Sequence, residues 1–381
     1  MEEYYDEEDM RRLQRMREKQ EMKQKQREQE LQKLRNRLIK IGIAAICVVA
    51  VVVVIVFAGR KPREDDSNQV ILAKEGRQSL SKARMKIQAP EVQDAETENG
   101  KGAENAEEKQ RTYKYEATEE TLQLHDEISS SHTIFLDTQA GTVLANKDAM
   151  SRIVPASMTK VLTLLVAVEH IDDLDDKFTI TQEITDYCFL NDCSNAGYEK
   201  GETVTIKDLL YATVLPSGAD GALGLAFYVS GSQEAFMELM NAKLEELGLS
   251  ETAHFTNCVG VYDEDHYCTA YDMAVIMDAA LQNEVCVDVL SARTYQTSQT
   301  EQHPEGMLLS NWFIRRIEDK DTGGMIVGGK TGYVDQSGNC AVSFGTDQEG
   351  KRYICVTANA TSKWSCIVDH AYLYKYFSGN A

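Results

Sequence analysis

The chain has 381 residues, of which 43% are hydrophobic and 8% aromatic, which is enough apolar material for a globular core and excludes wholesale disorder. Its 61 acidic and 40 basic residues give a formal net charge of −21, which disfavours nucleic acid as a partner because a polyanion would be repelled. Nine cysteines are too few for a disulfide-dense scaffold, so folding must depend on a hydrophobic core.

The N-terminal third of the chain predicts a membrane anchor and a tether. Residues 41–58 form an 18-residue run with no polar side chain, which spans roughly 27 Å as a helix and suits a bilayer. Twelve Lys and Arg residues lie between residues 11 and 40, and only three follow the run closely. The positive-inside rule therefore predicts a single-pass protein of the cell membrane with a cytoplasmic N-terminus and an extracytoplasmic remainder. The predicted organisation is a charged, helical cytoplasmic segment (1–40), a transmembrane anchor (41–59), a disordered polar linker (60–115) and an extracytoplasmic catalytic domain (116–381).

The predicted domain begins and ends with strand patterns. Residues 132–148 indicate two short strands around a turn at Gln139–Gly141, and residues 158–171 have a helical period. Residues 340–347 and 353–360 indicate a hairpin, and residues 369–377 a closing helix. The pattern predicts an α+β or α/β sandwich whose sheet joins the N- and C-terminal segments of the domain.

Eight of the cysteines lie in the predicted extracytoplasmic part. Cys188 with Cys193, and Cys258 with Cys268, are close enough in sequence to pair, whereas buried free thiols are the simpler alternative. The sequence leaves both alternatives open.

Two common classes of hydrolase are disfavoured. The seven histidines include no H-E-x-x-H and no close pair with an acid at ligand spacing, so a zinc peptidase is disfavoured. No G-x-S-x-G elbow is present either.

The segment PASMTK carries the strongest catalytic pattern. Ser157 and Lys160 stand three residues apart at the start of an apolar helix, so their side chains share one face. Burial would lower the pKa of the lysine enough for it to act as a base. Free N–H groups in the first helical turn would stabilise an oxyanion. A second S-x-x-K, Ser79–Lys82, lies in the polar linker without an apolar helix, and we discount it.

Two later segments add to this pattern: LPSGADGA with Ser217, and GGKTGY with Lys330, Thr331 and Gly332. Together the three resemble the S-x-x-K, S-x-N and K-T-G set of the penicillin-recognising serine acyl enzymes. The nearest resemblance is to the serine-type D-alanyl-D-alanine carboxypeptidases, the low-molecular-mass penicillin-binding proteins of the peptidase S11 type. It extends over roughly residues 120–378, with several longer segments in family order.

The resemblance implies a β-lactamase-like sandwich with a five-stranded antiparallel sheet between helices, and no metal or organic cofactor. It implies that Ser157 attacks the penultimate D-alanine carbonyl of a peptidoglycan stem peptide and that Lys160 takes its proton. Lys330 and Thr331 would hold the terminal carboxylate, with Lys330 also keeping Lys160 from a full charge, and the N–H groups of Ser157 and Tyr333 would form the oxyanion hole. Ser217 would relay protons between the lysines. The partners implied are the stem peptide as substrate and β-lactams as inhibitors, and the N-terminal helix would take over the membrane attachment that many members owe to a C-terminal tail.

The chain departs from the family pattern at Ala219, where asparagine is usual. The loss of one neutral hydrogen bond costs about 0.5–1.5 kcal/mol, roughly tenfold in rate, so we expect weakened activity, which Asp220 or water could partly restore. Ser337–Asn339 repeats the S-x-N spacing, and we interpret it as a polar turn. Two alternatives stay open: a β-lactamase, although no clear E-x-x-L-N segment is present, and a catalytically weak cell-wall scaffold.

Overall fold

The computed structural model describes residues 113–378 of the chain. The predicted cytoplasmic segment, the anchor and nearly all of the polar linker lie outside the described residues, as do Cys47 and the discounted Ser79–Lys82 motif. Within residues 113–378, no helix is both long and apolar enough to cross a bilayer.

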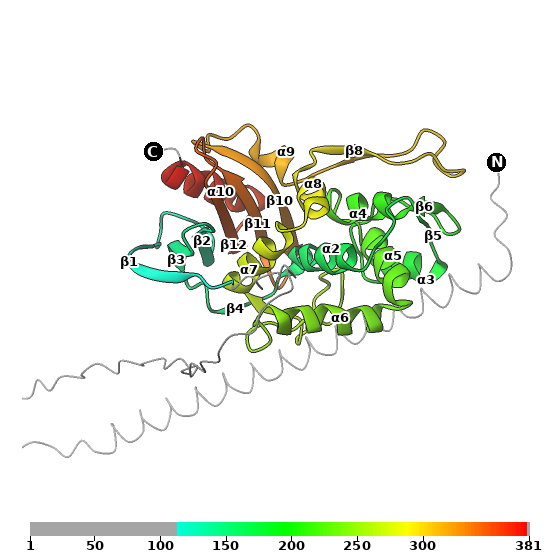
Figure 1. Cartoon of the computed structure of the whole chain (residues 1–381), viewed down its shortest axis with the longest axis horizontal. Helices are drawn as coiled ribbons and strands as arrows, with labels where there is room; N and C mark the ends of the chain where they lie inside the picture. The colour runs from blue at the N-terminus through cyan, green and yellow to red at the C-terminus, as the bar shows by residue number, and fades with distance from the viewer. Residues whose placement is uncertain (1–112, 379–381) are drawn as a thin grey trace, which may run out of the picture. The chain divides into compact units, whose positions relative to one another are not determined.

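The centre of the domain is a six-stranded sheet, which stands at one end in Figure 1. In spatial order its strands are β1 (Glu116–Gln123), β3 (Thr142–Lys147), β2 (His132–Asp137), β12 (Arg352–Ala360), β11 (Gly338–Thr346) and β10 (Met325–Val334). Because β2 pairs with β12, the sheet joins segments from both ends of the domain, which confirms the predicted sandwich and its C-terminal hairpin.

The expected five-stranded, purely antiparallel sheet is wrong in both number and direction. The sixth strand, β1, lies at the sheet edge and pairs with β3 in parallel, which makes the sheet mixed. Six of the eight β1 residues are exposed, the first five of them in a row, so this strand lacks the alternation of buried and exposed residues by which a half-buried strand is recognised.

Helices form the other part of the domain and cover both faces of the sheet (Figure 1). They are η1 (Ala156–Thr159, a 3₁₀ turn), α2 (Lys160–Glu169), α3 (Gln182–Leu190), α4 (Ile206–Val214), α5 (Ala219–Ser230), α6 (Gln233–Glu246), α7 (Ala270–Ala280), α8 (Glu284–Ser291), α9 (Ile314–Ile317) and α10 (Lys363–Ser378). Three short strand pairs complete the domain: β4 (Arg152–Ile153) with β7 (Cys268–Thr269), β5 (Lys177–Thr179) with β6 (Thr203–Thr205), and β8 (Thr294–Gln296) with β9 (Leu308–Ser310).

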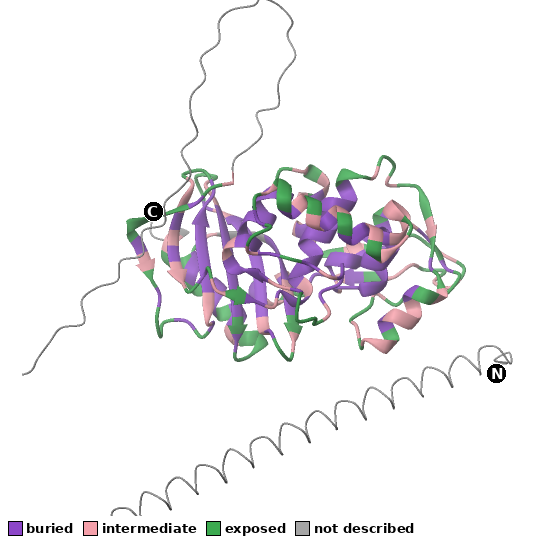
Figure 2. Ribbon diagram, turned by 90° about the horizontal axis from the view of Figure 1, so that it is seen from below, coloured by how far each residue is buried: buried purple, intermediate pink, exposed green. Residues whose placement is uncertain are grey.

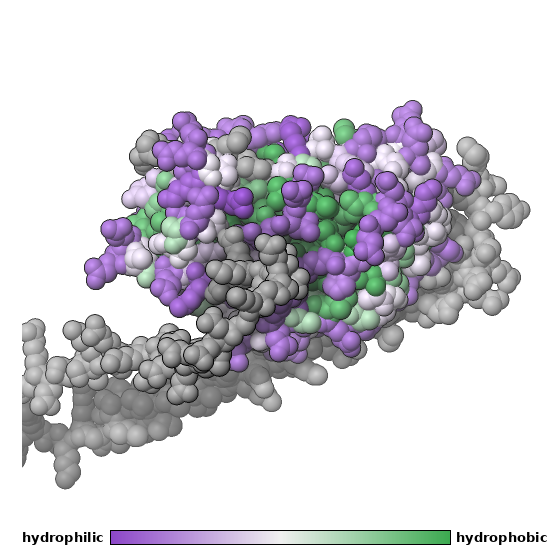
Figure 3. All heavy atoms as spheres, in the orientation of Figure 1, coloured by the Kyte–Doolittle hydropathy of each residue, from purple (hydrophilic) through white to green (hydrophobic). Residues whose placement is uncertain are grey.

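The two sheet faces belong to different cores. Ile134 and Leu136 of β2 pack with α2 and α7, whereas Phe135 between them packs with Leu373 and Tyr374 of α10. Figure 2 shows the buried sheet strands and helix faces between exposed loops. In the space-filling view, hydrophilic residues lie around the periphery and hydrophobic ones gather near the middle (Figure 3).

The helix α2, which follows the predicted nucleophile, is almost entirely buried. Nine of its ten residues, Lys160 to Val168, are buried. The helix packs against α7, so Lys160, its first residue, is buried together with the apolar residues that follow it.

All eight cysteines among the described residues are free thiols. Seven of them are buried and Cys193 is partly exposed, so the structure has the free-thiol alternative in place of the two sequence-adjacent pairs.

Candidate active site

The predicted nucleophile lies in a strained turn. Ala156, immediately before Ser157, has φ of 47°, a left-handed conformation that is unusual for a residue with a side chain. The turn continues as η1 and then α2, and Ser157 is half-buried between the fully buried Ala156 and Met158. Such strained residues cluster at functional sites, where surrounding structure holds them.

Lys160 lies next to Ser157, as the spacing predicts. Its Nζ donates to Ser157 Oγ at 3.1 Å and to the backbone carbonyl of Val259 at 2.6 Å. The residue is only 2% exposed, and burial lowers the pKa of Lys160 to about 8 although nearby cysteines and Asp220 oppose the shift. A lysine with this pKa is partly neutral near pH 7 and can accept the proton of the serine.

Ser217 and Lys330 form a second serine–lysine pair. Ser217 lies between α4 and α5 with φ of 66°, a second non-glycine residue in the left-handed region. Lys330 Nζ donates to Ser217 Oγ at 2.8 Å and to the Thr331 carbonyl at 2.7 Å. Burial lowers the pKa of Lys330 well below its usual value, and the charge of Lys160 acts in the same direction. No hydrogen bond joins Ser217 to Lys160 within the described domain, so the contact observed for Ser217 is with Lys330.

Both pairs border one cavity of about 460 Å³. Its lining consists of Ser157, Ser194, Ser217, Trp312, Arg316, Thr331, Gly332, Tyr333, Asn339, Cys340, Lys363 and Cys366. The structure thus brings together all the predicted motif residues: Lys160 and Lys330 lie behind the serines, and the exposed Tyr333 side chain stands at the rim.

Gly332 allows the strand β10 to approach the nucleophile. A Cβ on Gly332 would lie 2.7 Å from Cys340 Sγ and 3.1 Å from the Ser157 backbone nitrogen. Only a residue without a side chain therefore fits between β10 and the turn that carries Ser157.

Asp220 does not replace the missing asparagine. Its carboxylate accepts the backbone N–H groups of Ala196, Gly197 and Tyr198 at 2.8 to 3.2 Å. Burial raises the pKa of Asp220, and these N–H groups oppose the shift. Asp220 therefore fixes the 194–198 loop, which carries Ser194 of the cavity wall.

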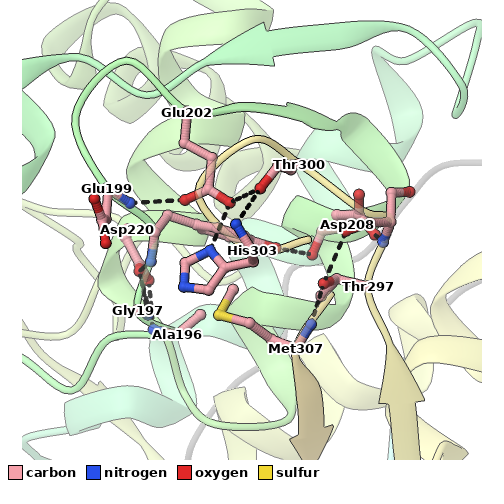
Figure 4. A network of polar contacts seen from close by, with 12 residues as sticks. Ala196, Gly197, Glu199, Glu202, Asp208, Asp220, Thr297, Thr300, His303 and Met307 are labelled. Carbon is pink, nitrogen blue, oxygen red and sulfur yellow. Dashed lines mark hydrogen bonds and ion pairs between the residues drawn. The ribbon is translucent and has the colours of Figure 1, made fainter. Parts of the chain in front are cut away.

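Figure 4 shows how Glu202, which follows this loop, is tied to the segment between β8 and β9. Glu202, only 1% exposed, accepts from the Glu199 backbone at 2.8 Å and from Thr300 Oγ1 at 2.8 Å, and it pairs with His303 at 2.9 Å. The buried Asp208 accepts from the Ser298 backbone at 3.0 Å. These contacts join the loops at the helical end of the domain.

Sequence reasoning missed Asn257, which shapes the turn behind Lys160. Its Oδ1 accepts the backbone N–H groups of Val259, Gly260 and Val261 at 3.3, 2.7 and 3.0 Å. Its Nδ2 donates to the Val261 carbonyl at 2.9 Å. The side chain thereby presents the Val259 carbonyl to Lys160, and no spacing rule in the sequence indicates this role.

His266, also missed, supports the nucleophile turn from below. Its Nδ1 accepts from the Thr256 backbone at 3.0 Å, so its Nε2 carries the proton and donates to Thr159 Oγ1 at 2.8 Å. Burial lowers the pKa of His266 to about 3, which keeps the ring neutral.

The polar turn predicted for Ser337–Asn339 is only partly correct, because Ser337 ends the turn between β10 and β11 whereas Gly338 and Asn339 already belong to β11. Ser337 Oγ accepts from the Val334 backbone at 3.0 Å and donates to nearby carbonyls. Asn339 nevertheless lines the cavity, which the sequence did not indicate. Within residues 113–378, no group of three His, Cys, Asp or Glu side chains is placed to hold a metal ion.

The sequence is similar to those of known proteins. A sequence model of the D-alanyl-D-alanine carboxypeptidase family, peptidase S11, matches residues 117–362. A D-alanyl-D-alanine carboxypeptidase of Bacillus subtilis, DacF, is 37% identical over 43% of this chain and 41% of its own length. A D-alanyl-D-alanine carboxypeptidase of Streptomyces strain K15 is 32% identical over 58% of this chain and 78% of its own length. The chain thus spans less than half of the Bacillus protein and most of the Streptomyces one.

Solved structures show the same likeness. The Streptomyces K15 DD-transpeptidase matches with a TM-score of 0.58 and 26% identity, over 66% of this chain and 99% of that one. A D-alanyl-D-alanine carboxypeptidase of Mycobacterium tuberculosis matches with a TM-score of 0.58 and 25% identity, over 67% of this chain and 94% of that one.

Proposed function

The chain belongs to the D-alanyl-D-alanine carboxypeptidase family, and we propose that it removes the terminal D-alanine from peptidoglycan stem peptides through an acyl-enzyme on Ser157. The observation that carries the proposal is the pair of Ser–Lys contacts, 3.1 Å for Lys160 and 2.8 Å for Lys330, at one cavity. Each lysine is buried, so each is available as a proton acceptor or relay at neutral pH.

In the proposed mechanism, neutral Lys160 accepts the Ser157 proton as Oγ attacks the carbonyl of the penultimate D-alanine. The N–H groups of Ser157 and Tyr333 bind the oxyanion, and the approach of β10 that Gly332 permits supports this arrangement. Protonated Lys160 then gives this proton to the amine of the leaving D-alanine through Ser217, whose hydroxyl is held by Lys330, so the C–N bond breaks and Lys160 is neutral again. Water then attacks the carbonyl of the acyl-enzyme as Lys160 accepts its proton, and Lys160 passes that proton to Ser157 Oγ as the ester bond breaks.

β-Lactams are proposed to acylate the same serine, because they present a strained amide at the same place. A long-lived adduct would distinguish this protein from an efficient β-lactamase, which would release the drug. The scaffold alternative depends on Ala219, which is fully buried and has no side-chain polar group. The near-complete site around Ser157 supports an enzyme over a scaffold.

The test is intact mass over time of the full chain in detergent, mixed with benzylpenicillin and followed by peptide mapping. We expect one adduct, on Ser157, that is absent in Ser157→Ala. Ser79→Ala, which alters the other S-x-x-K, is the matched control and should acylate normally. Release of D-alanine from an acyl-D-Ala-D-Ala peptide should follow the same pattern, and turnover that survives Ser157→Ala would refute the proposal.

We further propose that residues 41–59 anchor the protein in the cell membrane, with residues 1–40 in the cytoplasm and the catalytic domain outside. The apolar run and the basic residues before it support this arrangement. Protease added to intact cells should digest the catalytic domain and leave an N-terminal epitope tag protected. A protected catalytic domain would contradict the orientation.

A further inference from the structure

The outer face of helix α10 carries a row of exposed apolar side chains. Trp364, Val368, Tyr372 and Tyr376 follow one another at intervals of four residues, and their exposed fractions are 52%, 51%, 36% and 45%. Residues four apart are neighbours on a helix surface, so these side chains form one continuous row about 18 Å long, which we call the α10 stripe. The rings of Tyr372 and Tyr376 lie 6.1 Å apart. A contiguous apolar surface of this kind marks an interaction site.

The opposite side of α10 is already engaged with the domain. Ile367 and Ala371 belong to one buried cluster, and Leu373 and Tyr374 pack with Phe135 of β2 in another. The helix therefore has a complete core-facing side without the stripe. The stripe remains half-exposed after the domain has folded, and it is available to an external partner.

The exposed face of α10 carries positive charge and no negative charge. The only acidic residue of the helix, Asp369, points inward, where it is 4% exposed and accepts hydrogen bonds from Ser130 at 2.6 and 2.8 Å. Lys363 and Lys375 are exposed at the two ends of the stripe. Lys363 Nζ lies 5.8 Å from the ring centroid of Trp364. The face therefore combines aromatic rings with flanking lysines, although the whole chain has a formal net charge of −21.

The lysines near the stripe are free to bind an external anion. Within residues 113–378, no ion pair involves Lys363. Lys375 pairs with Asp321 at 2.6 Å, but both side chains are exposed, and a pair of this kind is worth only about 0–1 kcal/mol. Charges more than about 8 Å away are screened at physiological salt, so these lysines and not the net charge of the chain govern a contact at this face.

A lipid surface is the partner that fits this face. Tryptophan and tyrosine rings flanked by lysines are typical of segments that lie at the membrane–water interface, where the lysines attract anionic headgroups. The proposed anchor ends at residue 59 and the described domain begins at residue 113. The connection of about 50 residues spans at most roughly 180 Å when fully extended, so it keeps the domain near the bilayer. A tethered face needs only a weak affinity of its own, because its binding is intramolecular.

We propose that the α10 stripe docks the catalytic domain on the anionic bilayer that holds the anchor, with its aromatic rings at the level of the headgroups. The proposal rests on the proposed anchor and adds a second, reversible contact that the domain itself makes. Lys363 and Cys366 in the first turns of α10 also line the active-site cavity. Docking therefore holds the cavity beside the lipid headgroups.

The experiment measures the contact of Trp364 with lipid in the full chain, reconstituted into vesicles of phosphatidylcholine and phosphatidylglycerol. The chain has two tryptophans, so Trp312→Phe leaves Trp364 as the sole tryptophan fluorophore. A nitroxide on the lipid headgroup quenches tryptophan emission only at short range. Because a tethered face is docked most of the time, the emission should fall roughly twofold when the labelled lipid replaces the unlabelled one.

Phe189→Trp, made together with Trp312→Phe and Trp364→Phe, gives a matched control. Phe189 is 55% exposed, and its helix α3 lies at the opposite end of the domain from α10 (Figure 1). The emission of this control should not respond to the labelled lipid. Val368→Asp places a charge in the middle of the stripe and should abolish the quenching of Trp364. Met150→Asp, at an exposed apolar residue outside the stripe, should leave the quenching unchanged.

Flotation of the vesicles tests the anchor separately. If the chain failed to float, the anchor would be refuted, and the same vesicles added in excess to the free chain would decide whether the stripe binds lipid by itself. Equal responses of Trp364 and the control at position 189, or quenching that survives Val368→Asp, would overturn the docking proposal. A lack of quenching together with a concentration-dependent dimer that Val368→Asp dissociates would overturn it in favour of a second copy of the chain. These readouts do not require acylation of Ser157.

Discussion

The contact between Gly260 and Ala156 gives a sharp test of how the nucleophile is held. Gly260 belongs to the Asn257 turn and has φ of +83°. A Cβ at this position would lie 1.9 Å from the Ala156 carbonyl oxygen and 2.9 Å from the Ser157 backbone nitrogen. The turn behind Lys160 and the turn that carries Ser157 are therefore in direct backbone contact.

Gly231 offers a matched control for the substitution Gly260→Ala. It has φ of +82°, and a Cβ added to it would meet no atom within 4 Å. Both changes carry the cost of a left-handed alanine, about 1–2 kcal/mol. Gly260→Ala must in addition move the Ala156 carbonyl by about 1 Å, since real Cβ contacts essentially never fall below 3.0 Å. Such overpacking costs about 1–3 kcal/mol more.

A displacement of about 1 Å beside the nucleophile lowers the rate by roughly 100-fold. We therefore expect Gly260→Ala to be about 100-fold slower in acylation by benzylpenicillin, followed by intact mass, and about 2–5 kcal/mol less stable in urea unfolding. Gly231→Ala should acylate at the wild-type rate and lose only about 1–2 kcal/mol. If the two variants acylate equally fast, the backbone contact does not position Ser157, and this account of the nucleophile turn is refuted.

Three further predictions follow from buried ionisable groups. Because the pKa of Lys160 is lowered to about 8, the acylation rate should rise about tenfold between pH 6 and pH 7 and level off above about pH 9, and a flat profile measured by intact mass would contradict a lysine base. Burial lowers the pKa of His370 to about 3, so between pH 6.5 and 3 the unfolded chain binds a proton that the folded one does not. The free energy of unfolding should therefore fall by about 1.4 kcal/mol for each unit by which the pH is lowered through this range, and His370→Gln should reduce this slope as measured by urea unfolding; an unchanged slope would exclude the effect. Asp220→Asn would turn an amide NH₂ toward backbone N–H donors, so the free energy of unfolding should fall by about 2–4 kcal/mol and the 194–198 loop should become open to limited proteolysis. Resistance equal to that of the wild type would show that the loop does not depend on the carboxylate.

The parts of the fold that could be predicted from sequence are those with strong hydrophobic patterning. The strands β2 and β12 are almost entirely buried, and turn residues flank them along the chain. A run of apolar residues bounded by turns predicts a strand without knowledge of its neighbours in the sheet. The strand β1 could not be found in this way, because its backbone pairs at the sheet edge while its side chains stay in water. Pairing at a sheet edge depends on the partner strand, so the sequence of β1 alone does not predict it.

The same distinction applies to the site. Ser157 and Lys160 are adjacent on one helical turn, so local spacing predicts their contact, and the resemblance supplies Ser217 and Lys330. Asn257 and Arg316 act only through the fold: the first aims a carbonyl at Lys160, and the second reaches the cavity from α9. Neither role follows a spacing rule: Asn257 bonds the residues just after it, but Lys160, which the Val259 carbonyl contacts, is 99 positions away from Val259 along the chain.

The arrangement around Ser217 explains why an alanine at position 219 is compatible with an assembled site. Ser217 has φ of 66°, and backbone bonds hold the residues that follow it: Gly218 N donates to the Ala212 carbonyl at 2.8 Å, and Ala219 N donates to the Ser194 carbonyl at 2.8 Å. Asp220 then fixes the loop that contains Ser194 through the N–H groups beyond it. The side chain at 219 takes no part in these bonds, so its replacement removes a polar contact to the substrate without releasing the serine. A binding interaction is lost while the proton path through Ser217 and Lys330 is kept, which is why the expected effect is about tenfold in rate and not the loss of catalysis.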